Sequence, residues 1–436
     1  MATPAENPTS FEPLMPSDRS IGLLREQARD VVTRAQALRR SLHSNTLNMV
    51  RLLVRQMNSY YSNKIEGQAT HPIHIAQALH RDFSQQPDIQ LRQRIAVAHI
   101  DAERAVERMV RDHQNPFHSD FLRQAHASLY AGLTPDERTT SDGILIEPGA
   151  FRSHNVTVGQ QLAPAHTAIH QCLDHWNMRY ASPYSPPFAT EDLLWMMATT
   201  HHRMAWIHPF EDGNGRAVRL QSHAILFPLG AGLWSINRGL ARERDAYYAK
   251  IQEADSPRLN DLDGRGFLSE RRLFEFASWM TQICLDQVSF MSKMLDLNAF
   301  KDRLAELIKL KTERRELIRP IQYVFFTGPL TRGDFKQMTG LEPKSAQRLL
   351  SSVLSGTGDP AMHLLESQST RDEIRPAIPL EALRYLFPNL YPDVDVKFDS
   401  DLERSVDVST EIITTAETDG YDPEAAMDWL RAPRLP

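Results

Sequence analysis

The chain has 436 residues, of which 41% are hydrophobic and 24% charged, and its formal net charge is −6 at pH 7. A chain of this length can form two or three domains, and its apolar and charged fractions are ordinary for a globular protein. The negative charge argues against nucleic-acid or membrane-surface binding by the whole molecule, although it permits one basic face.

Cysteine usage and the first residues indicate a compartment. Cys172 and Cys284 are the only cysteines, and their spacing forms neither a CxxC motif nor a disulfide framework, which fits a reducing cytoplasm. Residues 1–18 are polar and proline-rich, without the apolar core of a signal peptide, and the apolar run 224–234 is too short to span a bilayer. We therefore expect a cytoplasmic protein without a membrane segment, and a flexible or surface-draped start over residues 1–19.

Apolar residues at three- and four-residue steps predict helices over most of residues 20–113. The clearest runs are 21–60, which includes a second run at 47–57, and 71–113. A further helix is expected at 117–130, so the fold class is mainly α.

Two short β-branched runs, 143–146 and 155–159, interrupt this pattern and predict a β-hairpin. An edge strand of such a hairpin can dock an extended peptide, and the alternative is an ordinary surface hairpin on a helical core. The apolar side chains of the expected hairpin are Ile144, Leu145, Ile146, Val156 and Val158.

The stretch His208–Arg219, which reads HPFEDGNGRAVR, concentrates the chemistry of the chain. Gly213 and Gly215 suit a turn whose backbone closely approaches a ligand, and the residues after them resemble the first turns of a helix. A glycine-rich turn that leads into a helix N-terminus is an anion site, because free N–H groups and the positive dipole end point the same way.

The charged residues of the stretch fit the same interpretation. Asp212 offers the hard oxygen that Mg²⁺ prefers, and His208 can act as a base near neutral pH. Arg216 and Arg219 can make forked contacts with outer phosphates, and Asn214 can stabilise charge on a phosphate. Together these residues predict phosphoryl or nucleotidyl transfer.

This region allows two other interpretations. A metal-hydrolase cluster of His201, His202, His208 and Asp212 would leave the Gly-Asn-Gly turn and both arginines unexplained. A plain helical corner would make the motif residues a buried histidine and solvated arginines. His166, His170 and His175 also recur at helical spacing, and we interpret them as helix-face residues rather than metal ligands.

The stretch matches the signature of the Fic family, His-Pro-Phe-x-(Asp or Glu)-Gly-Asn-Gly-Arg-x-x-Arg, at every fixed position. The resemblance implies a Fic-type helical bundle, with a catalytic core at 114–267, that moves AMP from ATP·Mg²⁺ onto a hydroxyl side chain of a target protein. It also implies that the expected hairpin is a flap that docks the target, and that aromatic groups such as Tyr247 and Tyr248 bound the adenine.

A second stretch, Ser62-Asn63-Lys64-Ile65-Glu66-Gly67, resembles the family's inhibitory motif, (Ser or Thr)-x-x-x-Glu-(Gly or Asn). By itself it reads as a helix end closed by Gly67, where an acidic Glu66 mildly opposes the helix dipole. The resemblance implies that Glu66 pairs with Arg219 in the place of the γ-phosphate, so that ATP binds in an unproductive pose. Removal of AMP, with Glu66 activating water, and transfer of another phosphate-linked group are left open.

The C-terminal third changes character after linking helices at 268–317. Residues 318–390 resemble a winged helix-turn-helix domain, with a Thr331-capped helix that ends at Gly340, a second helix at 345–354, and wing strands at 364–366 and 374–378. The expected N-terminal helical region with the inhibitory motif covers 20–113, and the acidic tail 391–436 is expected to be partly disordered.

A winged helix binds DNA only where basic groups line its second helix and wing. Such groups are few here, so a DNA-binding regulator is one alternative and a protein-binding or dimerising domain is another. The candidates are Lys344, Arg348, Arg371 and Arg375. The sequence identifies neither the target protein nor the oligomeric state, and a homodimer stays open.

Overall fold

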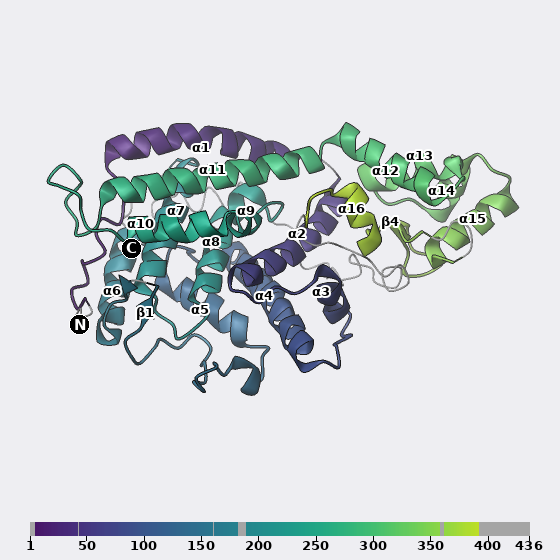
Figure 1. The fold of residues 1–436 in the computed structure, drawn as a ribbon. Coiled ribbons are helices and arrows are strands. Elements are labelled where there is room, and N and C mark those ends of the chain that lie inside the picture. The colour runs from purple at the N-terminus through teal and green to yellow at the C-terminus, as the bar shows by residue number, and fades with distance from the viewer. Residues whose placement is uncertain (1–4, 42, 160, 182–188, 358–361, 392–436) are drawn as a thin grey trace.

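The computed structural model describes residues 5–41, 43–159, 161–181, 189–357 and 362–391. The predicted acidic tail lies outside the described residues from position 392 onward. Figure 1 shows a large helical body and a smaller helical part at one end, with a long helix, α11, running along the body toward the smaller part. The mainly α class is confirmed. No described helix has the length and apolar character that crossing a bilayer would require.

The helices of the body follow the predicted periodicity. Their bounds are α1 Asp18–Leu38, α2 Ser44–Ile65, α3 Pro72–Leu79, α4 Pro87–Arg111, α5 Ser119–Tyr130, α6 Ile169–Trp176, α7 Asp192–Ile207, α8 Asn214–Gly230, α9 Asn237–Arg242, α10 Arg244–Ala254 and α11 Glu270–Met294.

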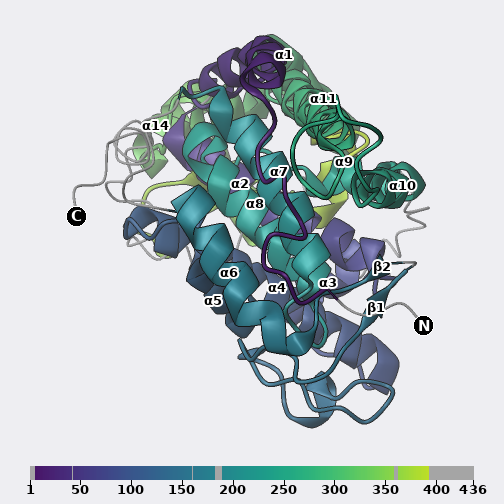
Figure 2. The ribbon, with the colours of Figure 1, turned by 90° about the vertical axis from the view of Figure 1, so that its left-hand side faces the viewer.

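Helices α7 and α8 form the centre of the body (Figure 2). Nearly all of their residues are buried, which is typical of core helices that are covered on every side. Helix α8 packs against α4, α5 and α7, while α1 and α11 pack against each other and against α7. The loop between α7 and α8 carries the His208–Asp212 part of the motif, so the motif is positioned by the two most buried helices of the fold.

The N-terminal stretch differs from the expected flexible start. Phe11 and Leu14 are fully buried, and the ring of Phe11 stacks on Trp206 with ring centroids 5.5 Å apart. The backbone also binds the body, because Leu268 N–H donates to the Glu12 carbonyl over 2.8 Å. The flexible alternative is therefore wrong for residues 5–17, and the surface-draped alternative describes them, because two apolar anchors fix this proline-rich segment on the body.

The predicted pairing of residues 143–146 with 155–159 is also wrong. Thr157–Val158 (β1) pairs antiparallel with Gln161–Leu162 (β2), and Leu145 forms a single bridge with Thr139. Each run closes on its own neighbours because a glycine at positive φ, Gly143 at 78° or Gly159 at 58°, turns the chain locally.

The smaller part contains elements where the sequence predicts helices and strands. They are α12 Leu297–Lys311, α13 Ile318–Phe326, α14 Arg332–Thr339, α15 Pro343–Ser355, β3 Leu365–Glu366, β4 Arg375–Pro376 and α16 Leu383–Leu386. The Thr331 side chain caps α14 by accepting a hydrogen bond from Asp334 N–H, and Gly340 ends the helix at a φ of 68°. β3 and β4 pair antiparallel, and Leu330 bridges to Ile374 beside them.

Candidate active site

The loop between α7 and α8 has a backbone shape that other segments hold in place. His208 adopts a left-handed conformation, with φ 51° and ψ 60°, which a non-glycine residue adopts only at a cost in free energy. Arg152, which is buried, stabilises it from the neighbouring segment: its Nε donates to the His208 carbonyl over 2.8 Å, and its backbone N–H donates to the Pro209 carbonyl over 2.9 Å.

Asn214 closes the same loop. Its Oδ1 accepts from the Phe210 N–H over 2.9 Å, and its Nδ2 donates to the Phe210 carbonyl over 2.8 Å. The sequence assigns Asn214 to charge stabilisation at a phosphate. In this structure both ends of the buried amide bind the loop backbone, so Asn214 fixes the shape of the loop, and its role at a phosphate stays a prediction.

The N-terminus of α8 faces the loop without a capping side chain. Its N-cap residue is Gly213, so no side chain satisfies the N–H groups of the first turn, which lack intrahelical partners. The two predicted arginines lie on this helix, and both are buried, Arg216 with 6% and Arg219 with 1% of its surface exposed. The helix end and the arginines therefore concentrate positive charge in one place.

Asp212 lies at the entrance to this helix, with about half of its side chain exposed (49%). Arg216 Nη2 donates to its Oδ2 over 2.8 Å, and the Tyr130 hydroxyl donates to the same oxygen over 2.7 Å. Burial alone would raise the pKa of Asp212, but the charge of Arg216 and the Tyr130 bond outweigh it and lower the pKa. Asp212 is therefore an accessible, ionised carboxylate.

Glu66 and Arg219 contact each other across the site. Arg219 Nη2 lies 2.5 Å from Glu66 Oε1, and the same guanidinium donates to Ser62 through Nε to Oγ over 3.0 Å and through Nη2 to the carbonyl over 3.2 Å. Burial would raise the pKa of Glu66, but Arg219, with Arg216 beyond it, outweighs burial and lowers that pKa. Gly67 follows at a φ of 76° and ends the helix.

His208 is set up to accept a proton. Burial lowers its pKa to about 4, so the imidazole is neutral at physiological pH. A neutral imidazole has a free nitrogen lone pair that can take a proton from an incoming hydroxyl, and the charges of Glu66 and Asp212 act on this ring from the facing helix end and the same loop.

The two tyrosines on α10 occupy different environments. Tyr247 is buried, and its hydroxyl lies 2.8 Å from His201 Nε2, so its ring belongs to the core rather than to a surface that could stack on a base. Tyr248 is 41% exposed and donates its hydroxyl to the Ile65 carbonyl over 3.3 Å, beside Glu66. The assignment of Tyr247 to the adenine is corrected, and only Tyr248 lies at the lip of the site.

The expected flap residues do not share one strand pair. Ile144 and Leu145 are exposed and Ile146 is buried, all in the turn that bridges to Thr139, whereas Val158 belongs to β1 and Val156 directly precedes it.

The metal-hydrolase interpretation is wrong. Among the described residues, the group of His, Cys, Asp or Glu whose ligand atoms come close enough to hold a metal is Glu103, Glu107 and His223, and it contains no motif residue. His201 binds Ser222 and Tyr247, and His202 binds the Ile251 carbonyl. Arg55 lies 2.5 Å from Glu107, so this buried cluster is an ion network already balanced by cations.

Sequence reasoning missed Arg152, Tyr130 and His126, which all contact the loop. His126 Nε2 lies 3.0 Å from the Asp212 carbonyl, and its ring stacks on Phe210 with centroids 3.9 Å apart. The one available signal was the spacing of His126 and Tyr130, four residues apart on a predicted helix, which places both on one face.

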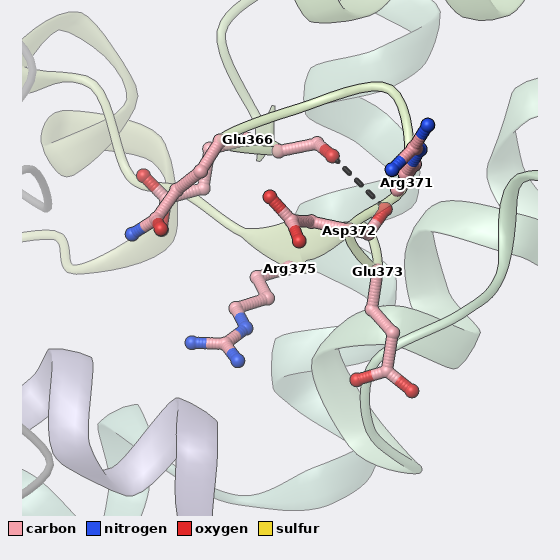
Figure 3. A pocket seen from close by; sticks show the side chains of 7 residues that line it. Glu366, Arg371, Asp372, Glu373 and Arg375 are labelled. Atoms are coloured by element: carbon pink, nitrogen blue, oxygen red, sulfur yellow. Dashed lines mark hydrogen bonds between the residues drawn. The ribbon is translucent and has the colours of Figure 1, made fainter.

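A polar surface pocket of about 250 Å³ lies far from this site, in the turn between β3 and β4 (Figure 3). Its lining includes Arg371 and Arg375 together with Glu366, Asp372 and Glu373, whose side chains point in different directions (Figure 3). Two cations among three anions give this pocket no positive character.

Comparison with known proteins finds a match for the segment that carries the site. Residues 116–226, which include the whole motif, match the model of the Fic/DOC family. The matched segment runs from just before α5 through most of α8, and the Ser62–Gly67 motif lies outside it.

Curated relatives that match part of the chain bear Fic or Fido names. A Fido domain-containing protein of Dictyostelium discoideum is 26% identical over 117 residues, which are 26% of this chain and 76% of the relative. The protein named protein adenylyltransferase Fic from Nematostella vectensis is 30% identical over 110 residues, and its namesake from Drosophila virilis 34% over 89 residues. This chain spans only 24% and 17% of those two relatives. The crystal structure of a Fic family protein from Desulfovibrio desulfuricans aligns with a TM-score of 0.47 at 20% identity, over 84% of this chain and 98% of that one.

Proposed function

We propose that this chain is a protein adenylyltransferase that moves AMP from ATP to a hydroxyl side chain of a target protein. The observation that carries the proposal is an uncapped helix N-terminus with two buried arginines, which directly follows a loop that begins at an unprotonated His208. The names of the partial relatives support the same reaction class.

The phosphates of ATP would lie over the Gly213–Gly215 turn, where backbone N–H groups and the helix dipole stabilise negative charge. Arg216 and Arg219 would hold the outer phosphates. Asp212 fits a Mg²⁺ that arrives on those phosphates, because its carboxylate is ionised and half exposed. The metal, when bound, supplies neutralisation of phosphate charge.

The target's hydroxyl oxygen attacks the α-phosphorus, and His208 accepts the hydroxyl proton. The bond from the α-phosphorus to the bridging oxygen breaks, pyrophosphate leaves, and AMP stays on the target as a phosphate ester. In the same proposal, the β1–β2 edge docks an extended stretch of the target, and the exposed ring of Tyr248 borders the adenine.

Glu66 would inhibit the reaction by occupying Arg219. The 2.5 Å pair leaves no room for a phosphate oxygen on the same Nη2 atom, so a triphosphate must either displace Glu66 or bind with its outer phosphate elsewhere.

Labelling of proteins with α-³²P-ATP in a cell lysate tests both parts. We expect Glu66→Gly to raise labelling severalfold over wild type, and His208→Ala added to that variant to abolish it. Glu313→Gly is the matched control, because Glu313 is 94% exposed and remote from the site, and it should label like wild type. Label that survives His208→Ala refutes the mechanism. A folded Glu66→Gly variant that labels no better than wild type refutes the inhibition.

We propose further that residues 318–390 form a winged helix-turn-helix domain that binds protein rather than DNA. The basic residues of α15, Lys344 and Arg348, are exposed, but the two wing arginines share their pocket with three carboxylates. Retention on duplex DNA that falls steeply with salt would show the DNA alternative to be correct.

A further inference from the structure

We propose that Tyr130 and His126, on one face of α5, are positioning residues for the Mg²⁺-bound nucleotide. They fix Asp212 and the loop between α7 and α8, residues 208–213, which we call the anion loop. This inference rests on the proposed function and adds two residues that the signature does not contain.

Tyr130 closes a triangle of hydrogen bonds around one carboxylate oxygen. Its hydroxyl donates to Asp212 Oδ2 over 2.7 Å and accepts from Arg216 Nη2 over 3.0 Å, while the same Nη2 donates to Asp212 Oδ2 over 2.8 Å. A half-exposed aspartate held by one arginine alone would sample several rotamers. The buried, rigid phenol selects one of them, so that Oδ1 is the oxygen left to serve the metal.

Tyr130 also forms the floor under the turn. A Cβ at Gly213 would lie 2.7 Å from the Tyr130 hydroxyl oxygen and 2.9 Å from its Cε2. The glycine is therefore required by this contact as well as by its φ of 75°. The loop and the tyrosine fit each other closely, and a displaced ring would move the turn.

His126 holds the backbone of the same residue. Its Nε2 must carry the proton, because the Asp212 carbonyl at 3.0 Å can only accept, and its Nδ1 accepts from Gly149 N–H over 2.9 Å. The ring also stacks on Phe210 at an angle of 11°. His126 thus connects the 147–151 turn to the anion loop. The Asp212 carbonyl and the Gly149 N–H together fix its tautomer.

The two residues act through Asp212, so their effect should depend on the metal. We would measure nucleotide affinity by calorimetry in a Glu66→Gly/His208→Ala parent, which removes the inhibitory pair and any turnover. We expect Tyr130→Phe to weaken binding of ATP with Mg²⁺ about five- to tenfold, the usual effect of one charge-assisted hydrogen bond, and binding of ATP in EDTA less than about twofold.

His126 provides a second, independent arm. His126→Leu should weaken Mg²⁺-dependent binding as Tyr130→Phe does, and His126→Gln, which keeps a donor for the Asp212 carbonyl, should restore most of it. Tyr180→Phe is the matched control, since Tyr180 is a buried tyrosine whose hydroxyl bonds to the Leu14 carbonyl, away from the loop. It should change neither affinity.

Equal losses with and without Mg²⁺ would show a merely structural role and overturn the proposal, as would unchanged affinity in both Tyr130→Phe and His126→Leu. A parent that binds no ATP at all is a different result, because it overturns the proposed function and this inference with it.

Discussion

Two glutamates on one face of α4, Glu103 and Glu107, should respond in opposite ways to the same substitution. Both are 1% exposed. Glu107 lies 2.5 Å from Arg55 and 3.0 Å from His223 Nε2, and although burial opposes it, these cations hold its pKa well below the ordinary value. Burial instead raises the pKa of Glu103 to about 7. His223 is 3.7 Å from this carboxyl, and the group that donates a hydrogen bond to Glu103 is the neutral Asn58, so neither outweighs burial.

Glu107→Gln removes a buried negative charge that compensates two cations, which we expect to cost about 3–5 kcal/mol of unfolding free energy. Glu103→Gln replaces a carboxyl that is about half protonated at pH 7 by a neutral group of the same shape and should cost less than about 1 kcal/mol. The new amide can be accommodated, because Asn58 Oδ1 has no hydrogen-bond partner within the described part of the chain, so its amide can turn over.

Urea unfolding at pH 7, with unchanged slopes, would measure both variants. The pH dependence adds a second check on Glu103. The unfolded chain loses this proton near pH 4.5 and the folded chain only near pH 7, so wild-type stability from this group is lost as the pH rises through that window. Glu103→Gln should therefore gain on wild type between pH 5 and pH 8. Equal losses in the two variants, or a larger loss in Glu103→Gln, would refute the reasoning.

Two further predictions concern the buried histidines and Gly213. Burial lowers the pKa of His99 and His201 to about 3 and of His126 and His208 to about 4. The unfolded chain takes up these protons near pH 6.5 and the folded chain does not, so unfolding free energy should fall from pH 7 to pH 5 by about 2 kcal/mol per histidine. The raised pKa values of Glu103 and His223 act in the opposite direction and reduce that fall in unfolding free energy. Urea midpoints that stay level or rise between pH 7 and pH 5 would contradict the prediction. Gly213→Ala should lower the unfolding free energy by about 1–3 kcal/mol more than Gly340→Ala does. Both glycines have a positive φ, but an added Cβ meets Tyr130 only at position 213, whereas no atom lies within 4 Å of it at position 340. Equal shifts in Tm for the two variants would count against the contact.

The contiguous features of this chain could be predicted from sequence because their physics is local. Periodic apolar residues define the helices, Thr331 and Gly340 mark the ends of α14, and the His208–Arg219 stretch lies within one loop and one helix turn. The contact of Glu66 with Arg219 was reached only through the resemblance, since 153 residues separate the two.

Features that depend on partners distant in the sequence could not be predicted in this way. That the Asn214 amide also holds the loop, through the backbone of Phe210, could not be read from the sequence. The sequence leaves open whether Tyr247 is a core or a surface aromatic, and only the contact of its hydroxyl with His201 decides this. The strand runs near 145 and 157 have similar propensity, and only the local turns at Gly143 and Gly159 decide that each pairs with its own neighbours.

Buried contacts hold α2, the helix that carries Ser62 and Glu66, along its length. Near its start Thr46 binds the Phe325 carbonyl, in its middle Ser59 donates to the Ala96 carbonyl over 2.8 Å, and near its end Tyr61 donates to the Leu390 carbonyl over 2.9 Å. Withdrawal of the helix would leave such groups unsatisfied, at about 1–3 kcal/mol each.

Rotation of the Glu66 side chain would break a single ion pair, and it would do so at the helix end, where the side chain is 32% exposed and open space surrounds the Gly67 position. Relief of the proposed inhibition should therefore be a change of Glu66 rotamer with α2 in place. Hydrogen exchange can decide this, because amides of α2 should keep their protection when ATP·Mg²⁺ is added to the Glu66→Gly variant and to wild type alike. Faster exchange along α2 on nucleotide binding would mean that the helix moves and that its buried contacts are weaker than their geometry implies.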